Sequence, residues 1–282
     1  MENILELDHR KVLDILPDRD REGHKGTFGR VLLLCGSKGY TGAAYLAAMG
    51  ALRCGSGLVF LGVPESIYAI EAVKLNEPVV FPLSDDDGKY HTSACDEIRS
   101  RLKEMDAVLI GCGMGRGSGP LSVLETVLKE ATCPVVLDAD GINQLSVHMD
   151  LLRRRKYPTV LTPHWGEFKR ISVPSPDMIT SAVSLATDTG AVILLKGHRT
   201  VITDGATVYC NPTGNPGMAT GGSGDVLAGM IVALLGQGIS PLDAAACSAW
   251  LHGAAGDICA RELGEYAMLP TDMLDALPRL LK

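Results

Sequence analysis

Short apolar runs recur along the chain and are separated by longer amphipathic stretches. The runs are continuous rather than alternating, which is typical of strands that are buried on both faces of a parallel sheet. We predict six such strands, at residues 30–35, 58–63, 107–110, 135–137, 159–161 and 192–195. Helical patterns cover residues 42–53, 121–130, 179–189, 225–235 and 241–263. This alternation predicts an α/β fold with a mainly parallel central sheet and helices on both faces.

A hairpin follows the last of these strands. Residues 200–204 and 206–210 are two β-like segments, and Asp204-Gly205 between them supplies a turn. The chain has no internal repeat, no low-complexity linker and no break in composition. We therefore expect residues 1–282 to form a single domain.

The balance of charge argues against a nucleic-acid partner. The chain carries 33 acidic and 26 basic residues, a formal charge of -7, so it lacks the global positive field that holds a polyanion. The basic run at residues 153–156 is a local exception. It is short and precedes an apolar strand, so we interpret it as a solvated helix end.

The cysteines and the N-terminus indicate the compartment. No two cysteines have C-x-x-C spacing, and most lie in apolar surroundings, so we interpret them as small core residues of a reducing compartment. The N-terminal residues resemble neither a signal peptide nor a transit peptide, and no apolar run is long enough to span a membrane. We expect a cytoplasmic protein without a membrane partner. The eight cysteines are Cys35, Cys54, Cys95, Cys112, Cys133, Cys210, Cys247 and Cys259.

Chemically active residues follow the predicted strands. Ligands of parallel α/β sheets bind beyond the carboxyl ends of the strands, and there the chain has glycines at 36–39 and 111–117, carboxylates at 138 and 140, His164 and Lys196. The glycine run 111–117 does not fit G-x-G-x-x-G, and the chain contains no P-loop. These absences disfavour a Rossmann dehydrogenase and a Walker ATPase.

The strongest local pattern is Gly-Gly-Ser-Gly-Asp225 directly before an apolar helix. Small residues let the backbone amides of Gly222, Ser223 and Gly224 converge at the helix N-terminus, where the helix dipole adds positive charge. This arrangement predicts an anion hole for a phosphate that is being transferred. Asp225 would then accept a proton from a substrate hydroxyl. The alternative is an ordinary aspartate at a helix start.

Several ordered motifs together resemble the NAD(P)H-hydrate dehydratases, a branch of the ribokinase-like fold. The resemblance covers about residues 20–280. It departs from the family at Cys112 and Met114, where proline and leucine are expected. The motifs are HKGTFGR at 24–30, YTGAA at 40–44, DADGIN at 138–143, TPHWGEF at 162–168, KGHRT at 196–200 and NPGMATGGSGDVLAG at 215–229.

The resemblance implies a role for each matching residue. Apart from the resemblance, Glu167 would hold Mg²⁺ through water, because phosphoryl transfer needs charge neutralised on the leaving oxygens; an ordinary helix-start glutamate is the alternative. His91, His148 and His252 lie outside such motifs and are interpreted as structural. The residues that would bind the hydrated dinucleotide are Ala43, Gly113 or Gly115, His164 and Asp225. Those that would bind the nucleotide are Lys196, Gly197, His198, Arg199, Thr200 and Gly224.

The resemblance implies a lyase reaction in which a kinase-like phosphorylation comes first. The S-epimer of hydrated NADH or NADPH is phosphorylated on its ring hydroxyl, and phosphate then leaves to restore the nicotinamide. The donor would be ADP rather than ATP, with Mg²⁺, in a homo-oligomer such as a tetramer.

Two other functions share the same residues. A small-molecule kinase would need the same fold, anion hole and base, although Thr162-Pro-His differs from the Thr-Pro-Asn associated with pyrimidine kinases. A nucleotide sensor without catalysis is the other alternative, and Asp225 argues against it.

Overall fold

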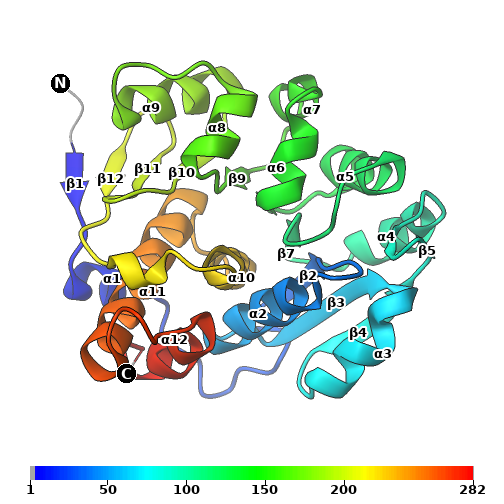
Figure 1. Ribbon diagram of the computed structural model, residues 1–282, viewed down its shortest axis with the longest axis horizontal. Helices are drawn as coiled ribbons and strands as arrows, with labels where there is room; N and C mark the ends of the chain where they lie inside the picture. Colours follow the sequence, from blue (N-terminus) through cyan, green and yellow to red (C-terminus); the bar gives the residue numbers. More distant parts are fainter. Residues whose placement is uncertain (1–3, 282) are drawn as a thin grey trace.

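Ten strands form one sheet in the computed structural model, which describes residues 4–281 (Figure 1). All neighbouring strands are parallel except for β11, which is antiparallel to β10 and β12. In spatial order the strands are β1 (Ile4–Glu6), β12 (Val208–Cys210), β11 (Val201–Thr203), β10 (Val192–Leu195), β9 (Thr159–Leu161), β8 (Val135–Leu137), β7 (Ala107–Ile110), β2 (Arg30–Leu34), β3 (Leu58–Pro64) and β4 (Val79–Leu83).

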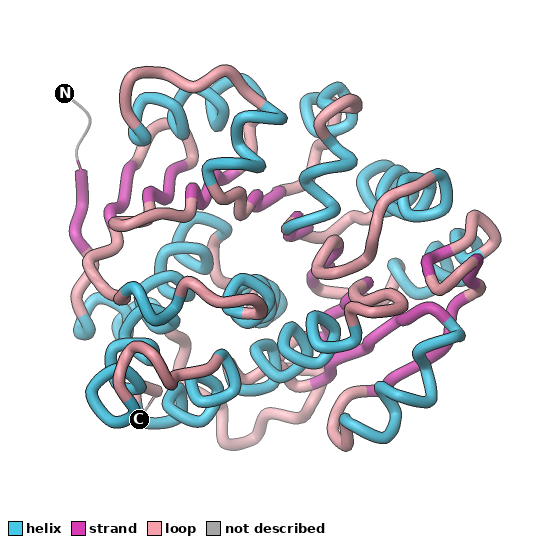
Figure 2. The backbone as a smooth tube through the Cα atoms, in the orientation of Figure 1, coloured by secondary structure: helices cyan, strands magenta, loops and turns pink. Residues whose placement is uncertain are grey.

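Helices cover both faces of this sheet (Figure 2). One layer contains α1 (His9–Ile15), α2 (Thr41–Arg53), α3 (Glu65–Lys74), α10 (Ser223–Gly236), α11 (Pro241–Leu263) and α12 (Pro270–Ala276). The other contains α4 (Ala94–Leu102), α5 (Ser118–Glu130), α6 (Ala139–Leu145), α7 (Met149–Arg153), α8 (Trp165–Ile171) and α9 (Met178–Thr189). The fold class predicted from the sequence is confirmed.

The core consists of two apolar layers, one on each face of the sheet. Along β2, Val31 and Leu33 pack into the first layer, whereas Leu32 and Leu34 pack into the second, and all four are fully buried. Successive side chains of a strand point to opposite faces, so a strand buried on both sides must be apolar throughout. This is why the continuous apolar runs predicted the central strands correctly.

The edges of the sheet were harder to predict. All six predicted strands, the five helices and the hairpin β11–β12 are present. The sequence did not indicate β1, which is short and exposed, or β4, which contains Pro82. Proline removes a ladder donor and is tolerated in an edge strand. The chain also forms an unpredicted two-stranded hairpin, β5 (Asp85–Asp86) with β6 (Lys89–Tyr90).

The order of the strands sets the position of a ligand site. From β2 the chain proceeds through β3 to β4 at one edge, and it then returns to place β7 on the other side of β2. The loops after β2 and β7 touch, because Gly36 N donates to Cys112 O over 2.8 Å. Ligands of doubly wound sheets bind at such a reversal, beyond the carboxyl ends of the strands.

Two glycines allow α2 and α10 to pack closely. A Cβ on Gly50 would lie 2.5 Å from Val226 O, and a Cβ on Gly229 would lie 2.1 Å from Ala47 O. Neither distance is compatible with a larger residue. The same helix α10 contacts β7 and β8, so this packing fixes its N-terminus beside the ends of those strands.

The basic run 153–156 is only partly the solvated helix end that the sequence predicted. Helix α7 ends at Arg153, and the Arg154 side chain is 83% exposed. Arg155 is instead half-buried and donates to the carbonyl oxygens of Leu128, Ala131 and Cys133 at 2.6–3.0 Å. Its guanidinium holds the loop between α5 and β8, a tertiary role that local sequence does not reveal. Within residues 4–281 no helix is both long and apolar enough to cross a membrane.

Candidate active site

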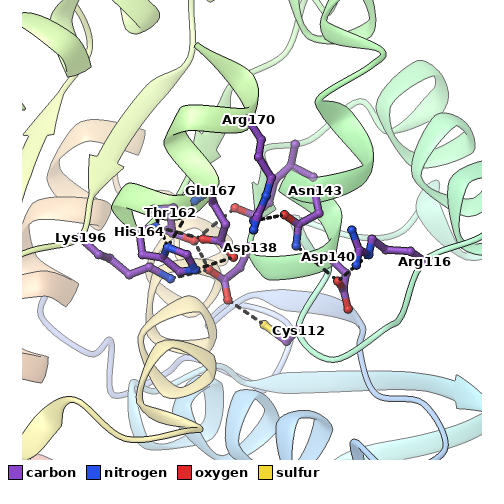
Figure 3. A network of polar contacts seen from close by, with 12 residues as sticks. Cys112, Arg116, Asp138, Asp140, Asn143, Thr162, His164, Glu167, Arg170 and Lys196 are labelled. Atoms are coloured by element: carbon purple, nitrogen blue, oxygen red, sulfur yellow. Dashed lines mark hydrogen bonds and ion pairs between the residues drawn. The ribbon is translucent and has the colours of Figure 1, made fainter. Parts of the chain in front are cut away.

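A buried carboxylate at the end of β8 organises a group of polar side chains (Figure 3). Asp138 is 2% exposed, and its Oδ1 accepts hydrogen bonds from Thr162 Oγ1 at 2.6 Å and from Lys196 Nζ at 2.9 Å. The Sγ of Cys112 lies 3.6 Å from Oδ2. These four residues follow the adjacent strands β7, β8, β9 and β10, so the sheet itself assembles the group.

Asp225 faces this group from the first turn of α10. Ligand atoms of Cys112, Asp138 and Asp225 all lie within 4.8 Å of one another. Burial, reinforced by the charge of Asp138, raises the pKa of Asp225 from an ordinary 3.8 to about 7, although a hydrogen bond from Cys112 and the charge of Lys196 act in the opposite direction. A carboxylate with such a pKa can accept a proton at neutral pH.

The N-terminus of α10 is open. Its N-cap residue is Gly222, which adopts φ 98° and has no side chain to bond the first amides. Within the described residues the backbone N–H groups of Gly224 and Asp225 have no acceptor. A Cβ on Gly224 would lie 3.3 Å from Lys196 Nζ, so the lysine ammonium stands beside these amides. Free amides, a helix dipole and a cation suit a phosphate.

Lys196 lies close to two carboxylates, Asp138 after β8 and Glu167 of α8. Burial alone lowers the pKa of Lys196, but the charges of Asp138 and Glu167 outweigh burial and leave the pKa raised. The side chain therefore stays cationic. The sequence predicted that Lys196 binds the nucleotide, and in this structure its ammonium is paired with Asp138.

His252 lies at the same helix start. The sequence predicted a structural role for His252, which is buried in α11 with its Nε2 3.3 Å from Ser223 Oγ. Burial lowers the pKa of His252 to about 4, so the ring is neutral at physiological pH. The distance to Ser223 in sequence is 29 residues, and no local pattern connects the two.

Helix α8 begins on the other side of Lys196, and its N-terminus is closed. His164 Nδ1 accepts hydrogen bonds from Gly166 N at 2.9 Å and Glu167 N at 3.3 Å, while Glu167 Oε2 accepts from His164 N at 3.0 Å. This reciprocal arrangement is a capping box. The His164 side chain is still 55% exposed. Glu167, the predicted Mg²⁺ contact, is buried and uses one carboxylate oxygen on its own helix.

The glycine loop after β7 forms the opposite wall. A Cβ on Gly113 would lie 2.7 Å from Ala43 Cβ, so two residues assigned to the substrate are neighbours. Gly115 donates its N–H to Asp140 Oδ2 at 3.0 Å, and Gly113 and Gly115 adopt φ 61° and 76°. These left-handed conformations favour glycine.

The predicted nucleotide loop, residues 196–200, turns away from this wall toward the edge of the sheet. Thr200 Oγ1 donates to Gly197 O at 3.2 Å, and Arg199 pairs with Glu6 of β1 at 3.1 Å. Arg199 adopts φ 63°, and His198 is exposed. The loop thus reaches the site through Lys196, while Arg199 contacts the outer strand.

Asp257, which the sequence did not indicate as a functional residue, anchors the loop that precedes α10. Asp257 of α11 accepts a hydrogen bond from Gly214 N and another from Asn215 Nδ2, each at 3.0 Å. Asn215 in turn accepts from Gly217 N. These bonds fix the loop at 211–218, which leads to Gly222. The asparagine was visible in its motif, but its partner lies 42 residues away.

Comparison with known proteins identifies the group to which the sequence belongs. Residues 31–279 match the family described as NAD(P)H-hydrate dehydratase. The chain belongs to this family.

Individual relatives agree with this assignment. A bifunctional NAD(P)H-hydrate repair enzyme of Moorella thermoacetica is 45% identical over 95% of this chain, which spans 52% of that protein. The chain thus covers about half the length of such relatives. An ADP-dependent (S)-NAD(P)H-hydrate dehydratase of Bacillus subtilis is 35% identical over 95% of this chain and 94% of its own length.

Solved structures show the ribokinase-like fold. A ribokinase-like superfamily protein of Enterococcus faecalis has a TM-score of 0.88 at 28% identity, covering 99% of this chain and 95% of that one. The ADP/ATP-dependent NAD(P)H-hydrate dehydratase of Bacillus subtilis, co-crystallized with ATP/Mg²⁺, has a TM-score of 0.83 at 33% identity, covering 99% and 98%.

Proposed function

We propose that this protein is a lyase that dehydrates the S-epimer of hydrated NADH or NADPH, with ADP preferred over ATP as phosphate donor. The observation that carries the proposal is the pairing of an open helix N-terminus with Asp225, whose pKa burial raises to about 7. Family membership supplies the substrate class, and the relative of Bacillus subtilis named ADP-dependent supports the choice of donor.

In the first step the carboxylate of Asp225 accepts the proton of the ring hydroxyl as the hydroxyl oxygen attacks the terminal phosphorus. The bond between that phosphorus and the bridging oxygen breaks, and the shortened nucleotide leaves. Negative charge on the transferred phosphoryl group would lie against the free amides of Gly224 and Asp225 and the ammonium of Lys196.

In the second step phosphate leaves the dinucleotide. The carbon–oxygen bond breaks with its electron pair on phosphate, the neighbouring carbon gives its proton to the departing phosphate, and the ring double bond forms again. We assign the nicotinamide ring to the wall formed by Ala43, Gly113 and Gly115, with the exposed His164 side chain as a further contact. Because His164 Nδ1 accepts two backbone hydrogen bonds, Nε2 is the donor nitrogen, and it lies 3.5 Å from Glu167 Oε1.

Magnesium fits the carboxylates of this site. Mg²⁺ prefers oxygen ligands and retains several waters, and Asp138 Oδ2 receives only a thiol at 3.6 Å. We propose that Asp138 and, through water, Glu167 hold the ion beside the phosphates. The ion would neutralise charge on the phosphate oxygens. The nucleotide loop at 196–200 would hold the rest of the donor, and assembly into a homo-oligomer belongs to the same proposal.

A product assay tests the function. The protein is incubated with hydrated NADPH, Mg²⁺ and either ADP or ATP, and the absorbance of NADPH is followed together with free phosphate. Recovery of NADPH with one phosphate released per turnover is the expected result, faster with ADP. A stable phosphorylated product would indicate a small-molecule kinase instead, and nucleotide binding without turnover would indicate a sensor.

A further inference from the structure

A ligand-sized space lies at the amino ends of β9 and β10, whereas Asp225 lies at the carboxyl ends of the strands. It is a cavity of about 620 Å³ bounded by the segment before β9, the end of α9 and the start of α11. Its lining includes Arg155, Tyr157 and Thr159, and none of the residues assigned to the active site. An adjoining space of about 410 Å³ shares Arg155, Lys156 and Tyr157 with it.

The guanidinium of Arg155 is a half-buried cation without a carboxylate partner within the described residues. Its two terminal nitrogens donate to carbonyl oxygens, which leaves Nε buried and without an acceptor. Burial accordingly lowers the pKa of Arg155. An unpaired charge and an unused donor are both costly in a protein interior.

Thr159 adds an independent sign of a missing partner at the same wall. It is the first residue of β9 and is 3% exposed, yet its Oγ1 has no hydrogen-bond partner in residues 4–281. A buried hydroxyl without a partner is unusual in a folded protein. The hydroxyl and Arg155 Nε are both donors, so the partner that would satisfy them is an oxygen acceptor.

The charges around the two spaces favour an anion as this partner. Five cations line them, Lys129 and the run 153–156, against the three carboxylates of Asp150, Asp188 and Asp204. Three of the cations are already paired: Arg153 with Asp150 and Asp188, Arg154 with Asp150, and Lys129 with Glu125. Arg155 and Lys156 have no ion pair within the described part of the chain, so they are the cations that an anion would meet. Tyr157 is 44% exposed and offers an apolar ring beside the cations.

We propose that this cavity binds a small organic anion whose carboxylate or phosphate oxygens are held by Lys156 and, once local side chains move to uncover these two buried donors, by Arg155 Nε and Thr159 Oγ1. Its carbon skeleton would lie on the ring of Tyr157. The basic run that the sequence singled out thereby gains a function outside the catalytic centre. The proposal does not depend on the identity of the reaction.

The position of this cavity relates it to the catalytic centre. Strands β9 and β10 begin at its wall, at Thr159 and Val192. The same strands lead to Thr162 and Lys196, which hold Asp138. Each strand has only three or four residues, so an occupant would lie about 10–13 Å from these side chains along the strand.

Binding of defined probes tests the proposal. Calorimetric titrations with inorganic phosphate and with citrate, at constant ionic strength, compare the wild type with Thr159→Val and Lys156→Gln, which keep side-chain shape or length. The control is Lys103→Gln, because Lys103 is an exposed cation after α4. We expect each cavity variant to weaken binding of one or both probes about 3- to 10-fold, with the control unchanged.

The probe with the larger loss distinguishes phosphate from carboxylate as the natural ligand chemistry. Crystals soaked in selenate, a phosphate mimic, are expected to show anomalous density at Arg155 and Thr159. The proposal is overturned if the wild type binds neither probe, if all variants match the wild type, or if selenate occupies only the N-terminus of α10.

Discussion

Two helices begin at the candidate active site, and they differ in whether side chains cap their first turns. Helix α8 closes its first turn with its own residues, because His164 and Glu167 form a capping box. Helix α10 begins with Gly222 and Gly224 and leaves amides without acceptors. Capping stabilises a helix but uses up the amides that could bind an anion. The proposed phosphate site would explain why α10 begins without a side-chain cap, whereas the cap of α8 holds two side chains in place.

The largest effect is expected from removing the base at the open helix. Asp225→Asn preserves shape and removes basicity, so kcat should fall by roughly 10²- to 10⁴-fold while nucleotide affinity changes far less. Single-turnover kinetics and calorimetry measure the two quantities. If Asp225→Asn reacts at the wild-type single-turnover rate, Asp225 is not the base and is only a residue of the first helical turn.

The pH dependence sharpens the same point. Because the pKa of Asp225 is raised to about 7, the reactive carboxylate is depleted below that pH, and kcat should fall close to tenfold per pH unit under acid conditions. The profile of Asp225→Asn should lack this limb. A wild-type rate that stays flat from pH 8 to about pH 5 would contradict the assignment.

As pH rises, the contribution of Asp225 to the free energy of unfolding should fall, whereas kcat should rise. A raised folded pKa means that the ionised form is disfavoured by folding, so the contribution of Asp225 is present below its unfolded pKa near 3.8 and is lost as pH rises through about 7. Asp225→Asn should therefore stabilise the protein at pH 8, by on the order of 4 kcal/mol, and not at pH 4. Denaturant unfolding at both pH values measures this, and an equal effect at both would refute it.

A smaller effect is expected at the lysine between the two helices. Lys196→Ala removes a cation from the amides of α10, so we expect the nucleotide dissociation constant to rise about tenfold. The same change leaves the buried Asp138 without its ion-pair partner, so the free energy of unfolding should fall as well. Lys169→Ala, an exposed cation of α8, is the control. Calorimetry with ADP and ATP that gives unchanged affinity would remove the 196–200 loop from the site.

The smallest effects distinguish the two roles of the closed helix. His164→Ala removes both the cap and the imidazole, and it should cost about 1 kcal/mol of stability. His164→Asn keeps a capping side chain, so its stability should match the wild type. Both variants should weaken binding of the hydrated dinucleotide more than binding of the nucleotide. Thermal-shift titrations with each ligand measure this, and the reverse preference would show that the two halves of the site are assigned backwards.

The sequence by itself determined the buried parallel strands, the helices between them and the open start of α10. These features are local: apolar runs indicate strands buried on both faces, and a glycine-rich segment before an apolar helix indicates free amides. The ordered motifs also brought together Asp225, Lys196 and His164 as residues of one site. Their individual roles stay predictions until the experiments above are done.

Only the tertiary structure decided which charges face one another. The pairing of Lys196 with Asp138, the contact of His252 with Ser223 and the burial of Arg155 join residues that are distant in sequence. A pattern along the chain carries no information about such contacts, because burial and neighbouring charges act through space. The raised pKa of Asp225 has the same origin: its sequence neighbours predict a helix start, whereas burial and the nearby charge of Asp138 raise its pKa.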